Sequence, residues 1–193
     1  MTKRSRIDRG FTLLEFLIVV GIVMIVSMIA LPGFTAAISN TRLRSSMTSL
    51  SGVLQSTRML AVKQNRTMTT RIAAQPAGII AHAKRAIDTE ALDIHDQQIE
   101  MEAPITQVTT LSGPGVPTAL DVDVLGFTPQ AGNPSFSALG MPCAYSLGTC
   151  PNFGFRYYFH DARTGDQMGW AALSISPAGR IKEWFWTGTS WVD

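Results

Sequence analysis

The feature that most constrains the fold of this chain is an apolar run near its N-terminus, residues 11–31, in which Glu15 is the only charged residue. As an α-helix at about 1.5 Å per residue, this run extends roughly 32 Å, which is enough to cross a hydrocarbon core of about 30 Å. A buried core helix is the alternative, but such helices seldom contain an apolar run of this length. The run therefore predicts a membrane-spanning helix.

A short basic leader, residues 1–10, precedes the apolar run. It contains Lys3, Arg4, Arg6 and Arg9 against Asp8, so it accounts for the formal net charge of +2 of the whole chain. The rest of the chain is nearly neutral, which argues against a general nucleic-acid-binding protein. Positive charge beside the first apolar segment tends to stay in the cytoplasm. We therefore expect the residues after the run to lie across the membrane.

The apolar run differs from that of an ordinary secretory signal. Such signals have about 7–15 apolar residues and are cleaved after them, and although Thr35-Ala36-Ala37 imitates a cleavage site, the run before it is too long. It also contains a carboxylate, and a charge deep in a membrane costs about 2.5–3.5 kcal/mol even on lenient scales. A helix that only anchors a protein in the membrane does not require a carboxylate, so we expect Glu15 to have a function.

The sequence Gly10-Phe11-Thr12-Leu13-Leu14-Glu15 resembles the processing site of type IV prepilins and type II secretion pseudopilins. That family has a glycine, then a phenylalanine, then a glutamate at the fifth position of the processed chain. The resemblance implies that a prepilin peptidase cuts between Gly10 and Phe11 on the cytoplasmic face and then methylates the new amine of Phe11. It also implies that the apolar run remains in the mature protein.

The resemblance also gives Glu15 a physical role in assembly. In a filament, its carboxylate faces the N-terminal amine of a neighbouring subunit, which relieves the penalty of a buried unpaired charge and fixes the axial register. The expected partners are therefore other pilin or pseudopilin subunits, in addition to the peptidase and the inner membrane. The expected topology is single-pass, with a cytoplasmic N-terminus and a periplasmic C-terminal domain. A chance glutamate near a helix end is the alternative.

The helix is expected to continue beyond the membrane. Pro32 predicts a kink or local melting, and pilins often have a proline at this place. From Asn40 to Arg71 the helical pattern resumes, with one apolar stripe and an opposite basic side. The stripe consists of Met47, Leu50, Leu54 and Ala61, supported by Val53 and Leu60, and the basic side contains Arg42, Arg44, Arg58, Lys63, Arg66 and Arg71. That side indicates nucleic-acid or lipid-headgroup binding, or else a solvated face, or a face that pairs with acids of the following domain.

From residue 67 onward, short apolar runs alternate with Gly and Pro, which is typical of strands and turns. We expect strands at Thr67–Ala73, Ile79–Ala83, Gln98–Glu102, Ala119–Val124, Phe153–Phe159, Trp170–Ser176 and Lys182–Thr187. The predicted fold is α+β: a long N-terminal helix packed on a mostly antiparallel sheet. The expected divisions are leader 1–10, membrane helix 11–31, amphipathic continuation 32–66 and β-rich periplasmic domain 67–193.

Within this superfamily the layout resembles the FimT/GspH branch of minor pilins and pseudopilins. The resemblance is carried by Gln55-Ser56-Thr57-Arg58, by Gly126-Phe127-Thr128-Pro129, and by the stretch from Ile175 to Ile181. The aromatic tail from Trp184 to Trp191 departs from the pattern of the branch.

Only two cysteines are present, Cys143 and Cys150. In an oxidising periplasm they are expected to form a disulfide that closes a small loop and contributes about 2–3 kcal/mol. Two free thiols are the alternative. Without a second pair, the spacing does not indicate zinc.

Nothing in the sequence indicates catalysis. The histidines His82, His95 and His160 are scattered and lack metal-ligand spacing, and neither a phosphate loop nor a nucleophile elbow occurs. We therefore expect no cofactor, no metal and no enzymatic activity.

A second hypothesis is DNA binding, because Gly179-Arg180-Ile181-Lys182 resembles the Gly-Arg-x-Arg motif of FimT-type pilins that are associated with DNA uptake. In that hypothesis the two cations hold phosphates and nearby tryptophans stack on bases. Those tryptophans are Trp184, Trp186 and Trp191. Glu183 beside the cations argues against it, and a β-turn with tryptophans covering the sheet is the structural alternative.

The sequence thus predicts a minor pilin or pseudopilin, a structural subunit of a type IV pilus or a type II secretion pseudopilus. A DNA-binding minor pilin is the first alternative. A signal-anchored periplasmic protein that never polymerises is the second.

Overall fold

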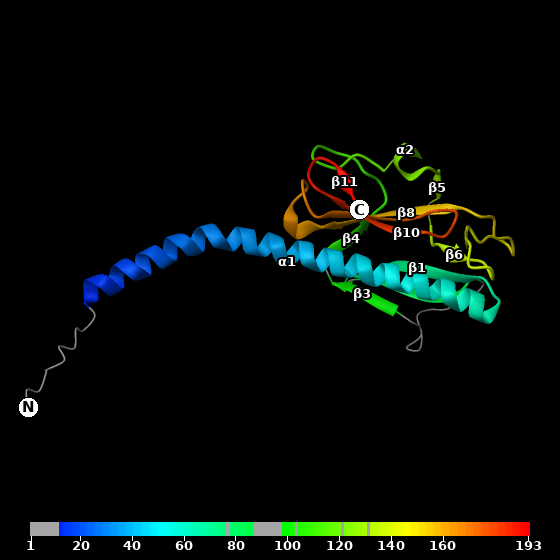
Figure 1. Cartoon of the computed structure of the whole chain (residues 1–193), viewed down its shortest axis with the longest axis horizontal. Coiled ribbons are helices and arrows are strands. Elements are labelled where there is room, and N and C mark those ends of the chain that lie inside the picture. The colour runs from blue at the N-terminus through cyan, green and yellow to red at the C-terminus, as the bar shows by residue number, and fades with distance from the viewer. Residues whose placement is uncertain (1–11, 76–77, 87–97, 103, 121, 131) are drawn as a thin grey trace, which may run out of the picture. The chain divides into compact units, whose positions relative to one another are not determined.

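The computed structural model describes residues 12–75, 78–86, 98–102, 104–120, 122–130 and 132–193. The chain divides into two compact units, Met1–Ile38 and Ser39–Asp193, and each is described by itself. Helix α1, Leu13–Gln64 (52 residues), contributes to both units (Figure 1). The predicted long helix is therefore present; its expected first residue, Phe11, lies outside the described residues.

In the first unit, α1 begins directly after Thr12, whose Oγ1 accepts a hydrogen bond from the backbone amide of Glu15 (3.2 Å). This is the bond by which a threonine caps a helix N-terminus. The segment Leu13–Ala30 is long and apolar enough to cross a membrane, and its side chains are not buried within the chain. An apolar helix surface left bare in this way needs lipid or other helices around it.

The helix is not interrupted at Pro32, because helical residues continue from Leu31 through Gly33 and beyond. Of the two effects expected from Pro32, local melting is therefore wrong. A proline removes one backbone hydrogen bond, and the bonds of the flanking turns are enough to keep the helix. A kink at this position stays a prediction.

In the second unit, the residues of α1 from Ser39 onward place one stripe in the core, as the sequence predicts. Leu43, Met47, Leu50 and Leu54 are fully buried, and their spacing of three or four residues puts them on one helix face. Thr57 is a buried polar residue on the same helix face. Its Oγ1 bonds the carbonyl of Val53 (2.8 Å) and accepts a hydrogen bond from Thr70 Oγ1 (2.9 Å).

Two sheets complete this unit (Figure 1). The first has the order β3-β2-β1-β6-β7, with antiparallel pairs throughout. Its strands are β1 (Met68–Gln75), β2 (Gly78–Arg85), β3 (Gln98–Glu102), β6 (Ser135–Phe136) and β7 (Pro142–Cys143).

The second sheet has the order β11-β10-β9-β8-β4, again antiparallel, and β5 joins β8 in parallel. Its strands are β4 (Ile105–Val108), β5 (Pro129–Gln130), β8 (Gly154–Asp161), β9 (Trp170–Ile175), β10 (Ile181–Trp186) and β11 (Trp191–Val192). A single-turn helix, η1 (Ala162–Thr164), follows β8.

The main core lies where the buried stripe of α1 meets both sheets. Ile79 and Met101 enter it from the first sheet, and Phe155, Phe159 and Leu173 enter it from the second. The opposite face of the second sheet carries a smaller core. It contains Leu120, Tyr158, Ala172 and Trp184, with Trp191 packed against them. The predicted α+β fold, one long helix on antiparallel sheets, is confirmed.

Six of the seven predicted strands are present, with ends shifted by at most two residues. The strand predicted at Ala119–Val124 is wrong, because a short helix, α2 (Val122–Leu125), lies there instead. Among the described residues this segment pairs with no strand. Leu120 of this segment covers the second sheet, because it is buried and its amide donates a hydrogen bond to Tyr158 Oη (2.8 Å).

Candidate functional site

The predicted processing site, Gly10 and Phe11, lies outside the described residues. The structure begins beside it, with Thr12 capping α1 and Glu15 exposed in the first turn. Thr12 and Glu15 have the spacing of a capping box, and a carboxylate in the first turn interacts favourably with the helix dipole. Glu15 therefore supports the start of the helix.

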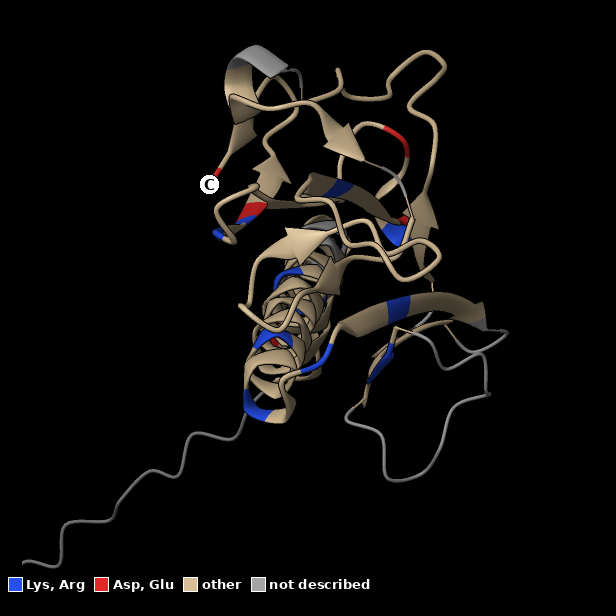
Figure 2. Cartoon of the chain, turned by 90° about the vertical axis from the view of Figure 1, so that its right-hand side faces the viewer, with Lys and Arg blue, Asp and Glu red and all other residues tan. Residues whose placement is uncertain are grey.

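The basic side of α1 is partly used inside the second unit. The Arg44 guanidinium lies 4.2 Å from the centre of the Phe185 ring, and Arg58 Nη1 donates a hydrogen bond to the carbonyl oxygen of Gly179 (3.0 Å). Lys63 remains exposed in the last turn of α1. The helical pattern predicted as far as Arg71 is wrong at its end, because α1 ends at Gln64, Arg66 lies exposed beyond it and Arg71 belongs to β1. Figure 2 shows the basic residues in blue along α1 and on strands of the first sheet. Some of these cations thus hold the helix to the second sheet.

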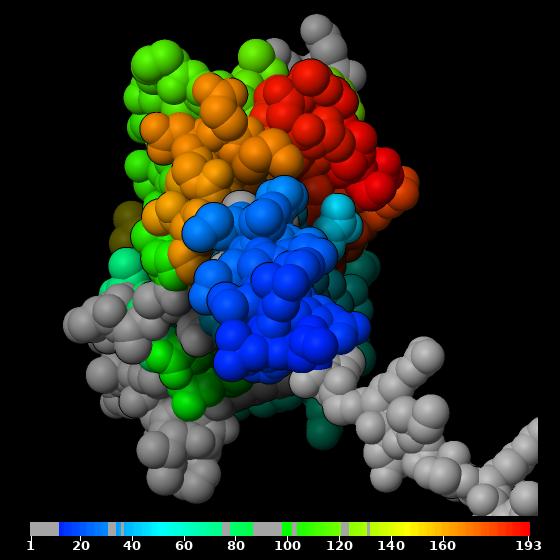
Figure 3. Space-filling view, turned by 90° about the vertical axis from the view of Figure 1, so that its left-hand side faces the viewer, coloured from blue at the N-terminus to red at the C-terminus, as the bar shows by residue number. Residues whose placement is uncertain are grey.

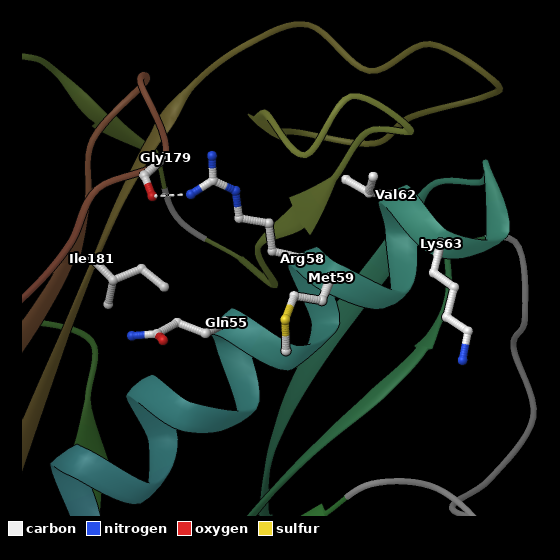
Figure 4. A pocket seen from close by; sticks show the side chains of 7 residues that line it. All are labelled: Gln55, Arg58, Met59, Val62, Lys63, Gly179 and Ile181. Atoms are coloured by element: carbon white, nitrogen blue, oxygen red, sulfur yellow. Dashed lines mark hydrogen bonds between the residues drawn. The ribbon is translucent and has the colours of Figure 1, made fainter.

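A cavity of about 630 Å³ adjoins this contact. Its lining consists of Gln55, Arg58, Met59, Val62 and Lys63 from α1, with Gly179 from the turn between β9 and β10 and Ile181 from β10 (Figure 4). Figure 4 shows Arg58 reaching across to the carbonyl of Gly179 at one side of the cavity, while Lys63 points away from it. The lining of this cavity is partly polar and partly apolar: it combines the hydrogen-bonded guanidinium of Arg58 with several apolar side chains.

The turn between β9 and β10 positions the cations of the DNA hypothesis. The Gly179 amide bonds the Ser176 carbonyl (2.7 Å), and the Ser176 amide bonds the Arg180 carbonyl (2.9 Å). Gly179 has a φ of 82°, a conformation that glycine adopts without strain. The predicted turn is therefore present, and it leaves Arg180 exposed at the start of β10.

Arg180 and Lys182 line one cavity of about 310 Å³, together with Ser174, Ser176 and Trp184. Lys182 is occupied within the chain: its Nζ forms an ion pair with Asp193 and lies 4.1 Å from the centre of the Trp184 ring. The hydrogen bond from Lys182, with its charge, holds the pKa of the exposed Asp193 carboxyl below its usual value. Sequence reasoning missed this pair, because nothing local links residues 182 and 193.

The tryptophans differ in their availability for stacking on bases. Trp184 is only 8% exposed, and its Nε1 donates to Ser174 Oγ (2.9 Å), so it belongs to the smaller core. Trp186 is half-buried and meets Trp191 edge-on, with ring centroids 5.5 Å apart. Trp191 donates from Nε1 to the Thr118 carbonyl (2.6 Å). These rings mainly cover the second sheet.

The C-terminal residues and the connection after β8 form one further face. They lie side by side in Figure 3, in red and orange, and together line a cavity of about 220 Å³. Its aromatic members are Trp170, Phe185 and Trp186. His160 packs nearby, with its ring centroid 4.3 Å from that of Trp170 and its Nε2 3.1 Å from the Gly165 carbonyl oxygen.

The structure contains the predicted disulfide between Cys143 and Cys150, whose Cα atoms lie 5.1 Å apart. Of the histidines, His82 is buried in β2 and His160 lies in β8, whereas His95 lies outside the described residues. Among the residues that the structure describes, no group of three or more His, Cys, Asp or Glu side chains is placed to hold a metal ion.

Comparison with known proteins identifies the N-terminal segment. Residues 5–31 match the family model described as the prokaryotic N-terminal methylation motif. No curated protein matches the chain. Among solved structures, the chain is similar to the type IV minor pilin FimU of Pseudomonas aeruginosa, with 17% identity, 79% of this chain and 94% of that chain covered, and a TM-score of 0.47. That likeness is too distant to support an argument, and the FimT/GspH branch stays a prediction.

Proposed function

We propose that this chain, whose residues 5–31 match the prokaryotic N-terminal methylation motif, is a member of the type IV pilin superfamily and functions as a minor pilin or pseudopilin. As such it is a structural subunit of a type IV pilus or of a type II secretion pseudopilus. The observation that carries the proposal is the coincidence of this motif, residues 5–31, with a bare apolar helix, Leu13–Ala30. A helix of this kind spans a membrane before assembly and packs against other such helices in a filament.

Maturation is the first step of the proposal. Prepilin peptidase hydrolyses the bond between Gly10 and Phe11 on the cytoplasmic side and methylates the new amine of Phe11. The basic leader keeps this end in the cytoplasm, and the second unit then lies in the periplasm. An oxidising compartment agrees with the disulfide between Cys143 and Cys150.

Assembly is the second step. When the subunit leaves the lipid, the Glu15 carboxylate pairs with the amine of Phe11 on a neighbouring subunit. Glu15 is exposed on the first turn of α1, so its carboxylate is open to a partner. Pairing removes the cost of an isolated charge in an apolar bundle and selects one axial register among many similar apolar contacts.

The mass and the N-terminal sequence of the chain recovered from membranes test the proposal, with and without active prepilin peptidase. We expect a mature chain that begins at methylated Phe11 only when the peptidase is active. A chain that stays uncut, or one cleaved beyond Ala37, contradicts the filament function and leaves a signal-anchored or secreted periplasmic protein.

A DNA-binding minor pilin is the second candidate, favoured by the cavity that Arg180 and Lys182 share. Because Trp184 is buried and Lys182 is paired with Asp193, DNA contact would depend mainly on Arg180 and on phosphate charge rather than on base stacking. A gel shift that weakens with salt and is lost in Arg180→Ala supports this function. A shift that Arg180→Ala leaves unchanged contradicts it.

A further inference from the structure

The loop closed by the disulfide, Cys143–Cys150, ends in a tip that the proposed filament function does not by itself explain. We propose that Leu147, at this tip, is an anchor that inserts into an apolar pocket on the globular domain of a neighbouring subunit. This inference rests on the proposed function, because it requires that the chain be assembled beside other subunits.

The backbone of the tip is the first observation. The Ser146 amide bonds the Thr149 carbonyl (3.0 Å) and the Thr149 amide bonds the Ser146 carbonyl (2.9 Å), so Leu147 and Gly148 form a two-residue hairpin turn. Both have positive φ, 47° and 85°. Such turns favour Asn, Asp or Gly at the first position, and a leucine in this conformation is strained.

The exposure of the same residue is the second observation. Leu147 is 101% exposed, so its side chain gains nothing from packing within the chain. Among the residues that the structure describes, the other non-glycine residue of positive φ is Asn65 (50°), which follows the last turn of α1, where asparagine in this conformation is ordinary. Strain at Leu147 without any packing inside the chain points to a contact outside it.

The base of the hairpin holds the tip in place. Cys143 is buried, belongs to β7 and pairs with Ser135 of β6, and the Phe153 amide bonds the Pro142 carbonyl (3.1 Å). The disulfide to Cys150 closes the loop above this base. A tip constrained in this way loses little conformational freedom on binding, which favours its use as a contact.

The chemistry of the loop indicates the kind of partner. The residues between the two cysteines are Ala144, Tyr145, Ser146, Leu147, Gly148 and Thr149, none of them charged. Nucleic acids and anionic lipid surfaces are bound through Lys and Arg, and one leucine is too little apolar surface to hold a protein on a membrane. A neutral, rigid tip with one apolar side chain fits an apolar pocket on another protein, because burying the tip there leaves no unpaired charge in an apolar environment.

Photo-crosslinking in assembled filaments tests the inference directly. The change Leu147→p-benzoylphenylalanine is made in the full chain in its host, and the same change at Leu139 is the control. Leu139 is also an exposed leucine (84%), but its φ is not positive. We expect Leu147 to give a crosslink to a second pilin-type subunit that maps to an apolar pocket, and Leu139 to give less. Equal yields at the two positions, or no crosslink at Leu147 within filaments, overturn the inference.

Substitution by asparagine separates a contact role from a structural one. Leu147→Asn suits the left-handed backbone, so its melting temperature is expected to equal or exceed that of the wild type, while its incorporation into filaments falls at least about tenfold. Leu139→Asn is expected to leave incorporation unchanged. Normal incorporation of Leu147→Asn overturns the inference and leaves the filament function intact. A wild-type chain that is neither processed nor incorporated overturns both.

Discussion

Arg58 of α1 donates a hydrogen bond from Nη1 to the carbonyl oxygen of Gly179, 3.0 Å away in the turn between β9 and β10. The guanidinium also occupies the space beside the Gly179 Cα, where an added Cβ would lie 3.0 Å from Arg58 Cζ. The helix and the turn are therefore fitted to each other. The same turn carries Arg180, so the contact also sets where this exposed cation lies.

Gly179→Ala is expected to destabilise the second unit. The positive φ of Gly179 (82°) costs a residue with a side chain about 1–2 kcal/mol, and the new methyl group displaces the Arg58 guanidinium. Thermal unfolding of the full chain in detergent measures the effect as a lower melting temperature.

Gly52→Ala is the matched control for this change. Gly52 lies within α1, and an added Cβ there meets nothing within 4 Å. Alanine is a better helix former by about 0.5–1 kcal/mol, so this variant is expected to melt at a higher temperature. If both glycine variants melt alike, the fit between Arg58 and Gly179 does not contribute to stability.

Glu15→Gln is expected to leave the chain in the membrane but remove it from filaments. Glutamine keeps the shape of the side chain and lacks the charge that would pair with the amine of Phe11. Membrane and sheared-filament fractions, compared by immunoblot, measure the distribution.

Thr12→Ala separates the two roles of Glu15. It removes the hydroxyl that accepts the hydrogen bond of the Glu15 amide and leaves the carboxylate in place. Losing the cap costs about 1 kcal/mol of helix stability, so incorporation is expected to fall little. A loss as large as that of Glu15→Gln would assign the effect to the start of the helix instead of to charge pairing.

The parts of the structure that follow a local period were predictable from the sequence. The buried stripe through Met47, Leu50 and Leu54 repeats with the helical period, and the strands around Tyr157 and Leu173 are short, mainly apolar segments bounded by turn residues. In these segments the spacing of the apolar residues matches the period of the helix or strand, so the local sequence predicts both the element and the side chains that it buries.

The parts that depend on distant partners were not predictable. The two-residue strands β5, β6, β7 and β11 exist only through their pairing, and the segment around Leu120 follows the sheet that it covers instead of its own alternation. The largest difference between the sequence-based prediction and the structure is at the candidate DNA site. Lys182 has Asp193 as its partner and Trp184 is part of a core, and neither fact has a signal in the local sequence.

Replacing both cysteines, Cys143→Ser with Cys150→Ser, is expected to destabilise the second unit by about 2–3 kcal/mol, the loop-closure contribution for a loop of this size. The hairpin is attached to the core through buried Cys143, so the loss appears as a lower melting temperature of the whole unit. Adding a reductant is expected to lower the melting temperature of the wild type and to leave the double variant unchanged. A wild type that is insensitive to complete reduction would contradict a stabilising disulfide.

Tyr157→Phe is expected to cost about 0.5–1.5 kcal/mol at neutral pH, because the buried hydroxyl donates a hydrogen bond to the Gly132 carbonyl (2.7 Å). Burial also raises the pKa of Tyr157 well above the usual value for tyrosine, 10.0. The unfolded chain therefore releases this proton at a lower pH than the folded chain does. The stability that depends on the protonated hydroxyl is complete below about pH 10 and is lost as the pH rises towards the folded-state pKa.

Melting temperatures measured from pH 8 to pH 11 check this sign. The wild type is expected to lose stability above about pH 10 more steeply than Tyr157→Phe, so that the two curves converge as the pH rises. Tyr145→Phe, on the half-exposed part of the disulfide loop, is the control and is expected to follow the wild type. Parallel curves for the wild type and Tyr157→Phe would show that the Tyr157 proton is not linked to folding, and that the cost at neutral pH comes from the lost hydrogen bond alone.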